Sequence, residues 1–558
     1  MPGVEALLEE LGIGDKDDEF KCEDETAPKG DWRGLPSATS TPSTAIARKS
    51  LKQVRTEVEK NMGKIPLFGR YHRYPRSLAE DYEVSSAVIG HGFNGSIKLA
   101  KSKHMTGQKF AVKTFSLVDI TSTERQVLMS EVMSFMCMDH PHVARLVDVY
   151  ESKKHLNLVM ECLDGGELLD RVTSLGNFTE EQAAKVTRQI LLAINYIHSH
   201  GIVHRDIKHS NILFEAEGSN TIKLIDFGFS KLVDADLDEN KEFELVEKQV
   251  SEEEPVRNER ENVAPSSQPT RLKRMTTNCG TIGYMAPEIR EATDGYTSKC
   301  DLWSVGVVVY QLVTGKMPVL KNGSVTLEDA DRWNDLSQTA KDFIEGLLRK
   351  LPEQRFSALD ALIHPWIESH STKHVADPSI VTALENYGNM PQVKRCLLHM
   401  LPWSLSNTER AKVSNEFLLL DEGYRGAIDL EELKNVLKRD ASRMFLKLGT
   451  NGTNEIRFSD FLAAVVVTHI GIHDELLRAS FKRFDIDSTG RISSDNIRLL
   501  LGDTYEGKPV EQLLSDMAKL GDDGITFEIF AGCIRGTLKL DGEDKQVKAA
   551  KMPCCVAQ

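Results

Sequence analysis

Five short motifs follow one another between residues 90 and 306 and constrain this chain more than any other feature. The first, at 90–97, is a Gly-x-Gly-x-x-Gly loop between two strand-like runs. The others are His-Arg-Asp, Asp-Phe-Gly, Ala-Pro-Glu and Asp-Leu-Trp, at 204–206, 226–228, 286–288 and 301–303. Glycine lacks a Cβ atom, so such a loop can approach a phosphate closely. A strand follows it where a dinucleotide-binding fold has a helix, which favours a phosphate-covering hairpin.

The ordered motifs resemble those of the eukaryotic protein kinases. The resemblance implies an α+β bilobal fold over residues 81–367, with strands first and helices later, and transfer of the ATP γ-phosphate to Ser or Thr side chains of proteins. Residues about 232–275 form an acidic insert in the activation segment. A catalytically silent scaffold or adaptor with a kinase fold is the alternative of another class. The presence of Lys113, Asp206 and Asp226 favours the enzyme.

The resemblance assigns catalytic roles to the positions that match. Asp206 is expected to accept the proton of the substrate hydroxyl, and Lys208 to lie beside the transferred phosphate. Lys113 is expected to hold the α and β phosphates while it pairs with Glu131. Phosphoryl transfer needs little covalent chemistry from the protein, so these groups act mainly by placing charge and aligning the acceptor.

The same resemblance implies sites for ATP and Mg²⁺. Asn211 and Asp226 are the expected metal ligands, because Mg²⁺ prefers oxygen donors. Arg355 is expected to form a structural ion pair with Glu288. The expected nucleotide contacts, besides Lys113, are Ile89, Gly90, Gly92, Gly95, Ile97, Ala111, Met160, Glu161, Leu163, Glu167 and Leu213.

The activation segment carries a candidate phosphorylation site at Thr277, with Thr276 beside it. Thr277 precedes a Cys-Gly-Thr sequence by two residues, a position that resembles the activating site of many kinases. A phosphate there is expected to order the segment by pairing with Arg205. Arg274 and Leu272 precede Thr277 in a basophilic pattern, so we expect autophosphorylation and protein substrates with Ser or Thr in a basic context.

Beyond residue 378 the chain changes to helical stretches that recur around short loops rich in Asp, Gly and Asn. Residues 368–410 predict amphipathic, partly basic autoinhibitory or junction helices that regulate the kinase. Such helices can lie on a kinase lobe or in the groove of a calmodulin-like domain. Residues 411–540 resemble EF-hands. Kinase, junction and EF-hands in this order resemble the calcium-dependent protein kinases of plants and protists, which implies an all-α calmodulin-like domain whose intramolecular partner is the junction.

Calcium binding depends on the oxygen ligands in each 12-residue loop. The first loop, 421–432, has Gly423 and Arg425 at positions three and five, and the loops at 449–460 and 521–529 lack ligands. The third loop keeps the only plausible, weak site, with candidate ligands Asp485, Asp487, Thr489, Arg491 and Asn496. We therefore expect weak or absent calcium control, the alternative being a true sensor that uses the third loop.

The two ends of the 558-residue chain differ from its middle. Residues 1–80 predict a flexible arm, and the tail, 541–558, ends in Cys-Val-Ala-Gln. Cys555 fits a farnesylated CaaX box, and Cys554 is a candidate for palmitate, so membrane association is possible in an otherwise cytoplasmic protein. The nine cysteines contain no Cys-x-x-Cys, which also favours a reducing compartment. The net charge of -15 argues against binding to nucleic acid.

Overall fold

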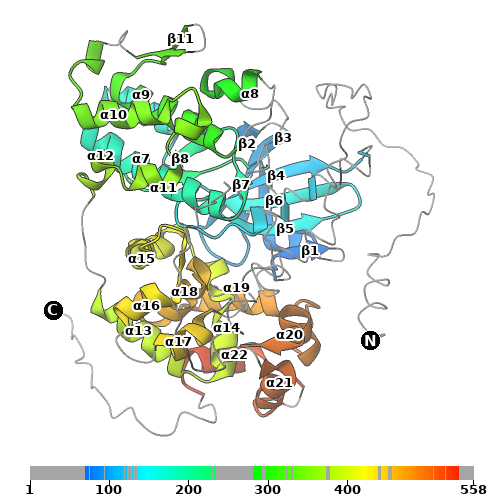
Figure 1. Cartoon of the computed structure of the whole chain (residues 1–558). Helices are drawn as coiled ribbons and strands as arrows, with labels where there is room; N and C mark the ends of the chain where they lie inside the picture. Colours follow the sequence, from blue (N-terminus) through cyan, green and yellow to red (C-terminus); the bar gives the residue numbers. More distant parts are fainter. Residues whose placement is uncertain are drawn as a thin grey trace, which may run out of the picture. The chain divides into compact units, whose positions relative to one another are not determined.

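The computed structural model describes residues 69–227, 231–232 and 281–538, with short internal gaps (Figure 1). The gaps are residues 74–75, 93–94, 119, 122–124, 126–127, 130–131, 134, 177, 292–296, 322–323, 328–330, 372–376, 438–440, 450–454, 507 and 522. Glu131, Thr276, Thr277, Cys554 and Cys555 therefore lie outside the described residues. So do residues 233–275 of the acidic insert and most of the N-terminal arm.

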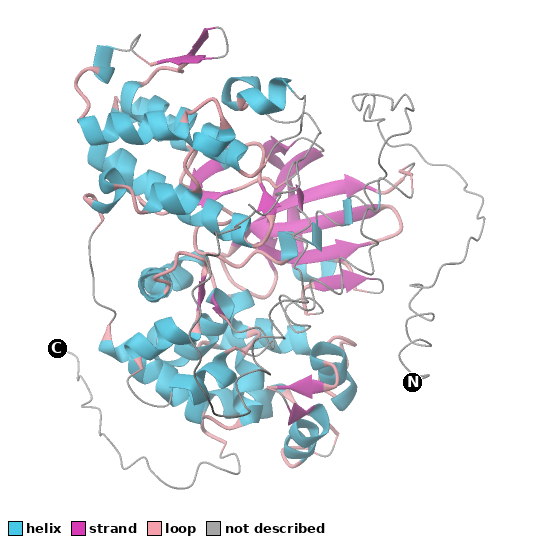
Figure 2. Ribbon diagram, in the orientation of Figure 1, coloured by secondary structure: helices cyan, strands magenta, loops and turns pink. Residues whose placement is uncertain are grey.

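A six-stranded sheet forms the first lobe, residues 69–161 (Figure 2). Its strands are β1 (Tyr71–Arg73), β2 (Tyr82–Gly92), β3 (Gly95–Ser102), β4 (Lys109–Ser116), β5 (Leu146–Glu151) and β6 (His155–Glu161), in the order β1-β5-β6-β4-β3-β2. Only β1 and β5 pair in parallel; the other neighbours are antiparallel. The sheet thus begins before residue 81, since β1 and the short helix α4 (Leu78–Asp81) precede β2.

Helices dominate the second lobe, residues 162–371. Helix α7 (Glu180–Ser199) starts with a capping box in which Thr179 and Gln182 satisfy each other's backbone N–H groups. Its Ile190, Ile194 and Ile197 are fully buried at a spacing of three to four residues, as expected of a core-facing helix. The other helices are α6 (Leu168–Leu175), α8 (Pro287–Glu291), α9 (Lys299–Thr314), α10 (Gln338–Leu347), α11 (Ala358–Leu362) and α12 (Pro365–Glu368).

Short strands complete this lobe and hold its loops. They form three antiparallel pairs: β7 (Ile202–Val203) with β10 (Lys231–Leu232), β8 (Ile212–Phe214) with β9 (Ile222–Leu224), and β11 (Val319–Lys321) with β12 (Ser324–Thr326). The first two pairs flank the His-Arg-Asp and Asp-Phe-Gly motifs, so they fix where the catalytic loop begins and ends.

The helical domain, residues 377–538, consists of paired helix-loop-helix units. Its helices are α13 (Pro378–Asn389), α14 (Gln392–Leu398), α15 (Asn407–Leu420), α16 (Leu430–Val436), α17 (Ala441–Leu448), α18 (Phe458–Val465), α19 (Asp474–Phe484), α20 (Ser494–Leu501), α21 (Val510–Ala518) and α22 (Phe527–Arg535). Strands β13 (Ala427–Ile428) and β14 (Ile456–Arg457) pair the first two loops, and an Ile492–Ile525 bridge pairs the last two. A further hairpin joins β15 (Thr504–Tyr505) to β16 (Lys508–Pro509). None of the helices within the described ranges is long and apolar enough to cross a membrane.

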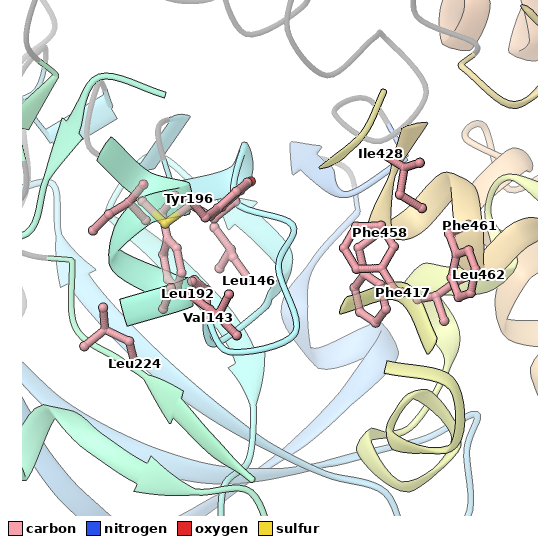
Figure 3. Close-up of a cluster of buried hydrophobic side chains, with 14 of the residues drawn as sticks. Val143, Leu146, Leu192, Tyr196, Leu224, Phe417, Ile428, Phe458, Phe461 and Leu462 are labelled. Atoms are coloured by element: carbon pink, nitrogen blue, oxygen red, sulfur yellow. The ribbon is translucent and has the colours of Figure 1, made fainter. Parts of the chain in front are cut away.

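The junction helices α13 and α14 pack against other helices of the helical domain. Helix α13 contacts α17 and α18, and α14 contacts α18, α21 and α22. Cys396, Leu397 and Leu398 are fully buried there. One contiguous set of buried side chains includes residues of both lobes and of the helical domain, and Figure 3 shows part of it, from Val143 to Leu462.

Candidate functional site

The expected nucleotide contacts come from strands that the sheet register brings together. Gly90 pairs with Ile97 across the β2–β3 hairpin, and Gly92 pairs with Gly95. On the next strands Ala111 lies opposite Met160. A bridge between Glu167 and Leu213 connects the segment after β6 to β8. Most of the apolar members remain partly accessible, namely Ile89, Ile97, Ala111, Met160, Leu163 and Leu213, as a surface for a purine base requires.

The Lys113 ammonium lies beside the carboxylate of the Asp-Phe-Gly motif. Its Nζ is 3.3 Å from Asp226 Oδ1, and the lysine is buried. Asp226 has a φ of 62°, a left-handed backbone that non-glycine residues rarely adopt. The strained turn places a carboxylate next to the expected phosphate-binding cation. The expected Lys113–Glu131 pair lies outside the described residues because Glu131 does.

Asp206 is held at the centre of a hydrogen-bonded cluster. Its carboxylate accepts from Lys208 Nζ at 2.7 Å and from Asn211 Nδ2 at 3.1 Å. Thr281 donates to it twice, from its hydroxyl at 2.8 Å and its backbone N–H at 3.1 Å. Lys208 also donates to Thr281 Oγ1 at 3.0 Å. Burial alone would raise the pKa of Asp206, but the hydrogen bonds from Lys208 and Thr281 outweigh it and lower the pKa. Asp206 is therefore ionised at neutral pH and able to accept a hydroxyl proton.

Buried groups beneath the catalytic loop fix its backbone. Asp301, on α9, accepts from the backbone N–H groups of His204 and Arg205 at 2.9 and 2.8 Å. Burial would raise the pKa of Asp301, but a hydrogen bond from His198 outweighs it and lowers the pKa. The His204 and Phe135 rings both contact Phe227, with centroids 5.0 and 5.3 Å away. The His-Arg-Asp and Asp-Phe-Gly motifs thus pack against each other through His204 and Phe227.

Asn211 and Asp226 fit the divalent metal that the motifs imply. The hydrogen bonds that Asn211 makes to Asp206 use its amide N–H groups, so its amide oxygen remains available as a ligand. With the Asp226 carboxylate it supplies two hard oxygen donors, the type that Mg²⁺ prefers. Lys113 Nζ, 3.3 Å from Asp226 Oδ1, places a positive charge beside this carboxylate.

The side chain of Glu161 lies in a buried set of hydrogen bonds and ion pairs. It accepts from Arg145 N and Arg410 Nη2, both at 2.6 Å, and lies 3.2 Å from Lys223 Nζ. Burial would raise its pKa, but the positive charges of Arg410 and Lys223 lower it to about 2. The backbone N–H of Glu161 donates to Arg145 O at 3.1 Å.

The ion pair expected between Arg355 and Glu288 is confirmed. Arg355 Nη1 and Nη2 donate to the two carboxylate oxygens at 2.7 and 3.0 Å, and the Arg355 side chain is fully buried. The bidentate geometry ties the end of the activation segment to the second lobe.

The first and third loops of the helical domain fold alike but contain different groups. In each, the first aspartate accepts backbone N–H groups, Asp421 from Arg425 and Gly426, and Asp485 from Thr489 and Gly490. The two glycines have φ values of 73° and 80°, which the sixth position of such a loop requires. The third loop also brings Asp487 Oδ1 within 2.9 Å of the Thr489 hydroxyl.

The third loop is the better fit to calcium. Asp485, Asp487 and Thr489 gather side-chain oxygens near its centre, whereas Asn496, at position twelve, uses its oxygen to accept from Ser493 N at 3.2 Å. The first loop contains the guanidinium of Arg425, 2.6 Å from Asp429 and 3.1 Å from Glu432. Among the described residues, no group of three or more His, Cys, Asp or Glu is arranged to hold a metal ion.

Buried polar contacts join the helical domain to the first lobe. Arg483, on α19, pairs with Asp148, on β5, and Arg410, on α15, pairs with Glu161. Ser459 N donates to Asp139 Oδ2 at 2.7 Å. Several of these groups are fully or almost fully buried, so the interface is fixed by specific geometry.

The sequence prediction missed several residues that shape the site. Thr281 stands in the Cys-Gly-Thr sequence, so a signal existed, but its contact with Asp206 was not expected. Asp301 begins the Asp-Leu-Trp motif, and its support of the catalytic loop was not anticipated either. Arg410 and Arg483 each stand among other charged residues on their helices, and no local pattern identifies their partners.

Comparison with known proteins agrees with this geometry. The protein kinase domain model matches residues 82–367. Calcium-dependent protein kinase 5 of Plasmodium falciparum is 27% identical over 487 residues, which cover 82% of this chain and 78% of the relative. Calcium-dependent protein kinase 7 of Arabidopsis thaliana is 29% identical over 478 residues, covering 80% and 81%. Calcium-dependent protein kinase 4 of Plasmodium berghei is 28% identical over 455 residues, covering 74% and 79%.

Proposed function

Because the chain belongs to the protein kinase family, and within it to the calcium-dependent protein kinases, it is a Ser/Thr protein kinase, and we propose that its activity depends weakly or not at all on calcium. The proposal has two parts, a complete phosphotransfer site in the lobes and a helical domain held on them without bound calcium. The Asp206–Lys208–Thr281 cluster is the observation that supports the first part most directly.

In the proposed reaction Asp206 orients the substrate hydroxyl and accepts its proton. Lys208, 2.7 Å from this carboxylate, neutralises charge on the transferred phosphate. Asn211 and Asp226 would hold Mg²⁺, and the bound ion would neutralise charge on the β and γ phosphates of ATP. Lys113, whose Nζ lies 3.3 Å from Asp226 Oδ1, would hold the α and β phosphates. Thr281 keeps Asp206 and Lys208 in place.

Weak calcium dependence is supported by the chemistry of the loops. The first loop holds an internal cation, Arg425, and the third loop lacks the bidentate glutamate that closes an EF-hand around calcium. The junction helices α13 and α14 make their most extensive contacts within the helical domain. The rival proposal is calcium activation through the third loop, favoured by its three clustered oxygen ligands.

We propose further sites outside the described residues. Thr277, with Thr276, is the candidate phosphorylation site of the activation segment, and Arg205, three residues before Lys208, is the partner proposed for its phosphate. Cys555 is the candidate prenylation site and Cys554 the candidate palmitoylation site. The proposed substrates are proteins with Ser or Thr in a basic context.

The test is transfer of labelled phosphate from Mg-ATP to a Ser-containing basic peptide by the purified full chain. We expect transfer by the wild type, and a loss of about 10²–10⁴-fold in kcat in D206N, the range that a general base contributes. Asp170, on α6, is an exposed carboxylate. The variant D170N therefore serves as a matched control and should retain activity. Equal rates in D206N and the wild type would show that Asp206 is not the base. Absence of any transfer would favour the scaffold.

A further inference from the structure

The guanidinium group of Arg425 lies where the first loop of the helical domain would hold a cation. Arg425 Nη2 is 2.6 Å from Asp429 Oδ2 and 3.1 Å from Glu432 Oε2, at positions nine and twelve of the loop. A Cβ atom built on Gly423, at position three, would lie 2.7 Å from Arg425 Nη1. The guanidinium therefore reaches from position five across to the other ligand positions.

The carboxylates of this loop are satisfied without a metal. Asp421 accepts from Arg425 N at 2.9 Å and from Gly426 N at 2.7 Å. Glu432 accepts from Gly423 N and from Asp429 N, both at 2.7 Å. Both carboxylates are buried. A calcium ion would have to displace the guanidinium of Arg425, because two cations cannot share one small set of oxygens.

The third loop provides an internal comparison. Thr489 occupies the position that corresponds to Arg425, and its hydroxyl donates to Asp487 at 2.9 Å. In the described part of the chain, no ion pair joins two residues of this loop; Asp495 pairs with Arg498, which lies beyond it. Arg425 places a cation among the ligand positions of the first loop, whereas Thr489 leaves the equivalent position of the third loop uncharged. The backbone hydrogen bonds to the first aspartate are alike in both loops.

The loop that contains Arg425 also contacts the kinase lobe. A Cβ atom on Gly426 would lie 2.4 Å from the Tyr196 ring and 2.9 Å from the His140 ring, so the loop backbone packs directly on both. Asn195 Nδ2, on α7, donates to Tyr424 O at 2.6 Å, and the Arg188 guanidinium lies 5.5 Å from the centre of the Tyr424 ring. This close fit needs the loop in its closed shape.

We propose that Arg425 is an intramolecular substitute for calcium, which keeps the first loop closed and docked on α7 at any calcium concentration. The Arg425 guanidinium thus takes the place that calcium has among the ligands of an EF-hand loop. This inference extends the proposed calcium independence, but it concerns the first loop only. Its test does not require kinase activity, so the two can fail separately.

The experiment compares full-length variants in a D485N background, which removes the first ligand of the third loop. G423D/R425D supplies carboxylates at positions three and five and removes the guanidinium. G423D alone supplies the carboxylate at position three and keeps Arg425, and R425K keeps a positive charge. Calcium binding is measured by calorimetry, and loop closure by hydrogen exchange of residues 424–432 and by the thermal midpoint, each in EGTA and in saturating calcium.

We expect the D485N parent, G423D and R425K to bind no calcium at this loop and to exchange equally in EGTA and calcium. G423D/R425D should exchange faster and melt at a lower temperature in EGTA, and one calcium ion should restore both. Calcium binding at the first loop of the parent would overturn the proposal. So would a double variant that stays closed in EGTA, or one that opens and is not restored by calcium.

Discussion

Arg483 and Asp148 form a buried bidentate ion pair between α19 of the helical domain and β5 of the first lobe. The Arg483 Nη1–Asp148 Oδ1 distance is 2.6 Å, and Arg483 Nη2 lies 3.3 Å from Oδ2. Arg483 also donates to the backbone carbonyl oxygen of Trp403 at 3.2 Å. One side chain thus connects the kinase sheet, the end of the junction and the third helix-loop-helix unit.

Removal of Arg483 should destabilise the protein strongly. R483A leaves the Asp148 carboxylate buried and uncompensated, which typically costs about 3–5 kcal/mol of the free energy of unfolding. R478A removes an exposed arginine from the same helix and should cost at most about 1 kcal/mol. Denaturant unfolding of the full chain measures both. Equal losses in the two variants would contradict a special role for the buried pair.

Asp148 should also make the protein sensitive to acid. Burial would raise its pKa, but Arg483 and a hydrogen bond with His72 outweigh it and lower the pKa from 3.8 to about 2. The Tyr82 hydroxyl donates to the same carboxylate at 2.5 Å. A carboxyl with a lower pKa in the folded state stabilises that state above its unfolded pKa and loses the effect as pH falls towards its folded pKa.

The stability from this group, about 2–3 kcal/mol, should therefore be present above pH 4 and lost between about pH 4 and pH 2. Chemical unfolding of the wild type and of D148N/R483M, followed over this range, measures the difference. The double variant should show a shallower loss with falling pH. Parallel curves for the two proteins would contradict the assignment.

Thr281 should set the rate of phosphate transfer without binding ATP. T281A removes the hydroxyl that donates to Asp206 and accepts from Lys208. Hydrogen bonds to charged groups contribute about 1.5–3 kcal/mol, so kcat should fall about 10- to 100-fold with little change in KM for ATP. T281S keeps the hydroxyl and should recover most of the rate. A serine variant as slow as T281A would point to packing of the methyl group instead.

The lysine ammonium group of R355K should not replace the guanidinium group of Arg355. R355K cannot make both bonds to Glu288 together with those to the carbonyl oxygens of Lys299 and Arg349. We expect a loss of about 2–4 kcal/mol in the free energy of unfolding, from bonds lost at a buried site. The exposed R349K should lie within about 0.5 kcal/mol of the wild type. Thermal unfolding compares the two.

The sequence motifs predicted much of the fold, because the same residues that shape a local turn also identify its chemical role. Glycines at 90, 92 and 95 predicted a hairpin, and β2 and β3 form one. The recurrence of Asp/Gly loops predicted helix-loop-helix units, which pair through β13–β14 and the Ile492–Ile525 bridge. The Arg355–Glu288 pair followed from the kinase resemblance.

Contacts between distant segments could not be read from local patterns. Arg483 and Asp148 are 335 residues apart, and neither stands in a distinctive motif. The missing ligands of the first loop were visible in the sequence, but the direction of the Arg425 side chain was not. The partner of the Glu161 side chain, Arg410, likewise comes from a helix 249 residues further along the chain.

The calcium dependence of phosphate transfer tests the proposed function most directly. Initial rates of the full-length wild type on a basic Ser peptide, with Mg-ATP, are measured in EGTA and in saturating calcium, beside D485N. We expect the two rates to differ by less than about tenfold, the effect of roughly 1.4 kcal/mol, and D485N to match the wild type. The contradicting result is a wild-type rate that falls more than about tenfold from calcium to EGTA, while the rate of D485N does not change between the two conditions. That result would show that the third loop is a true calcium sensor.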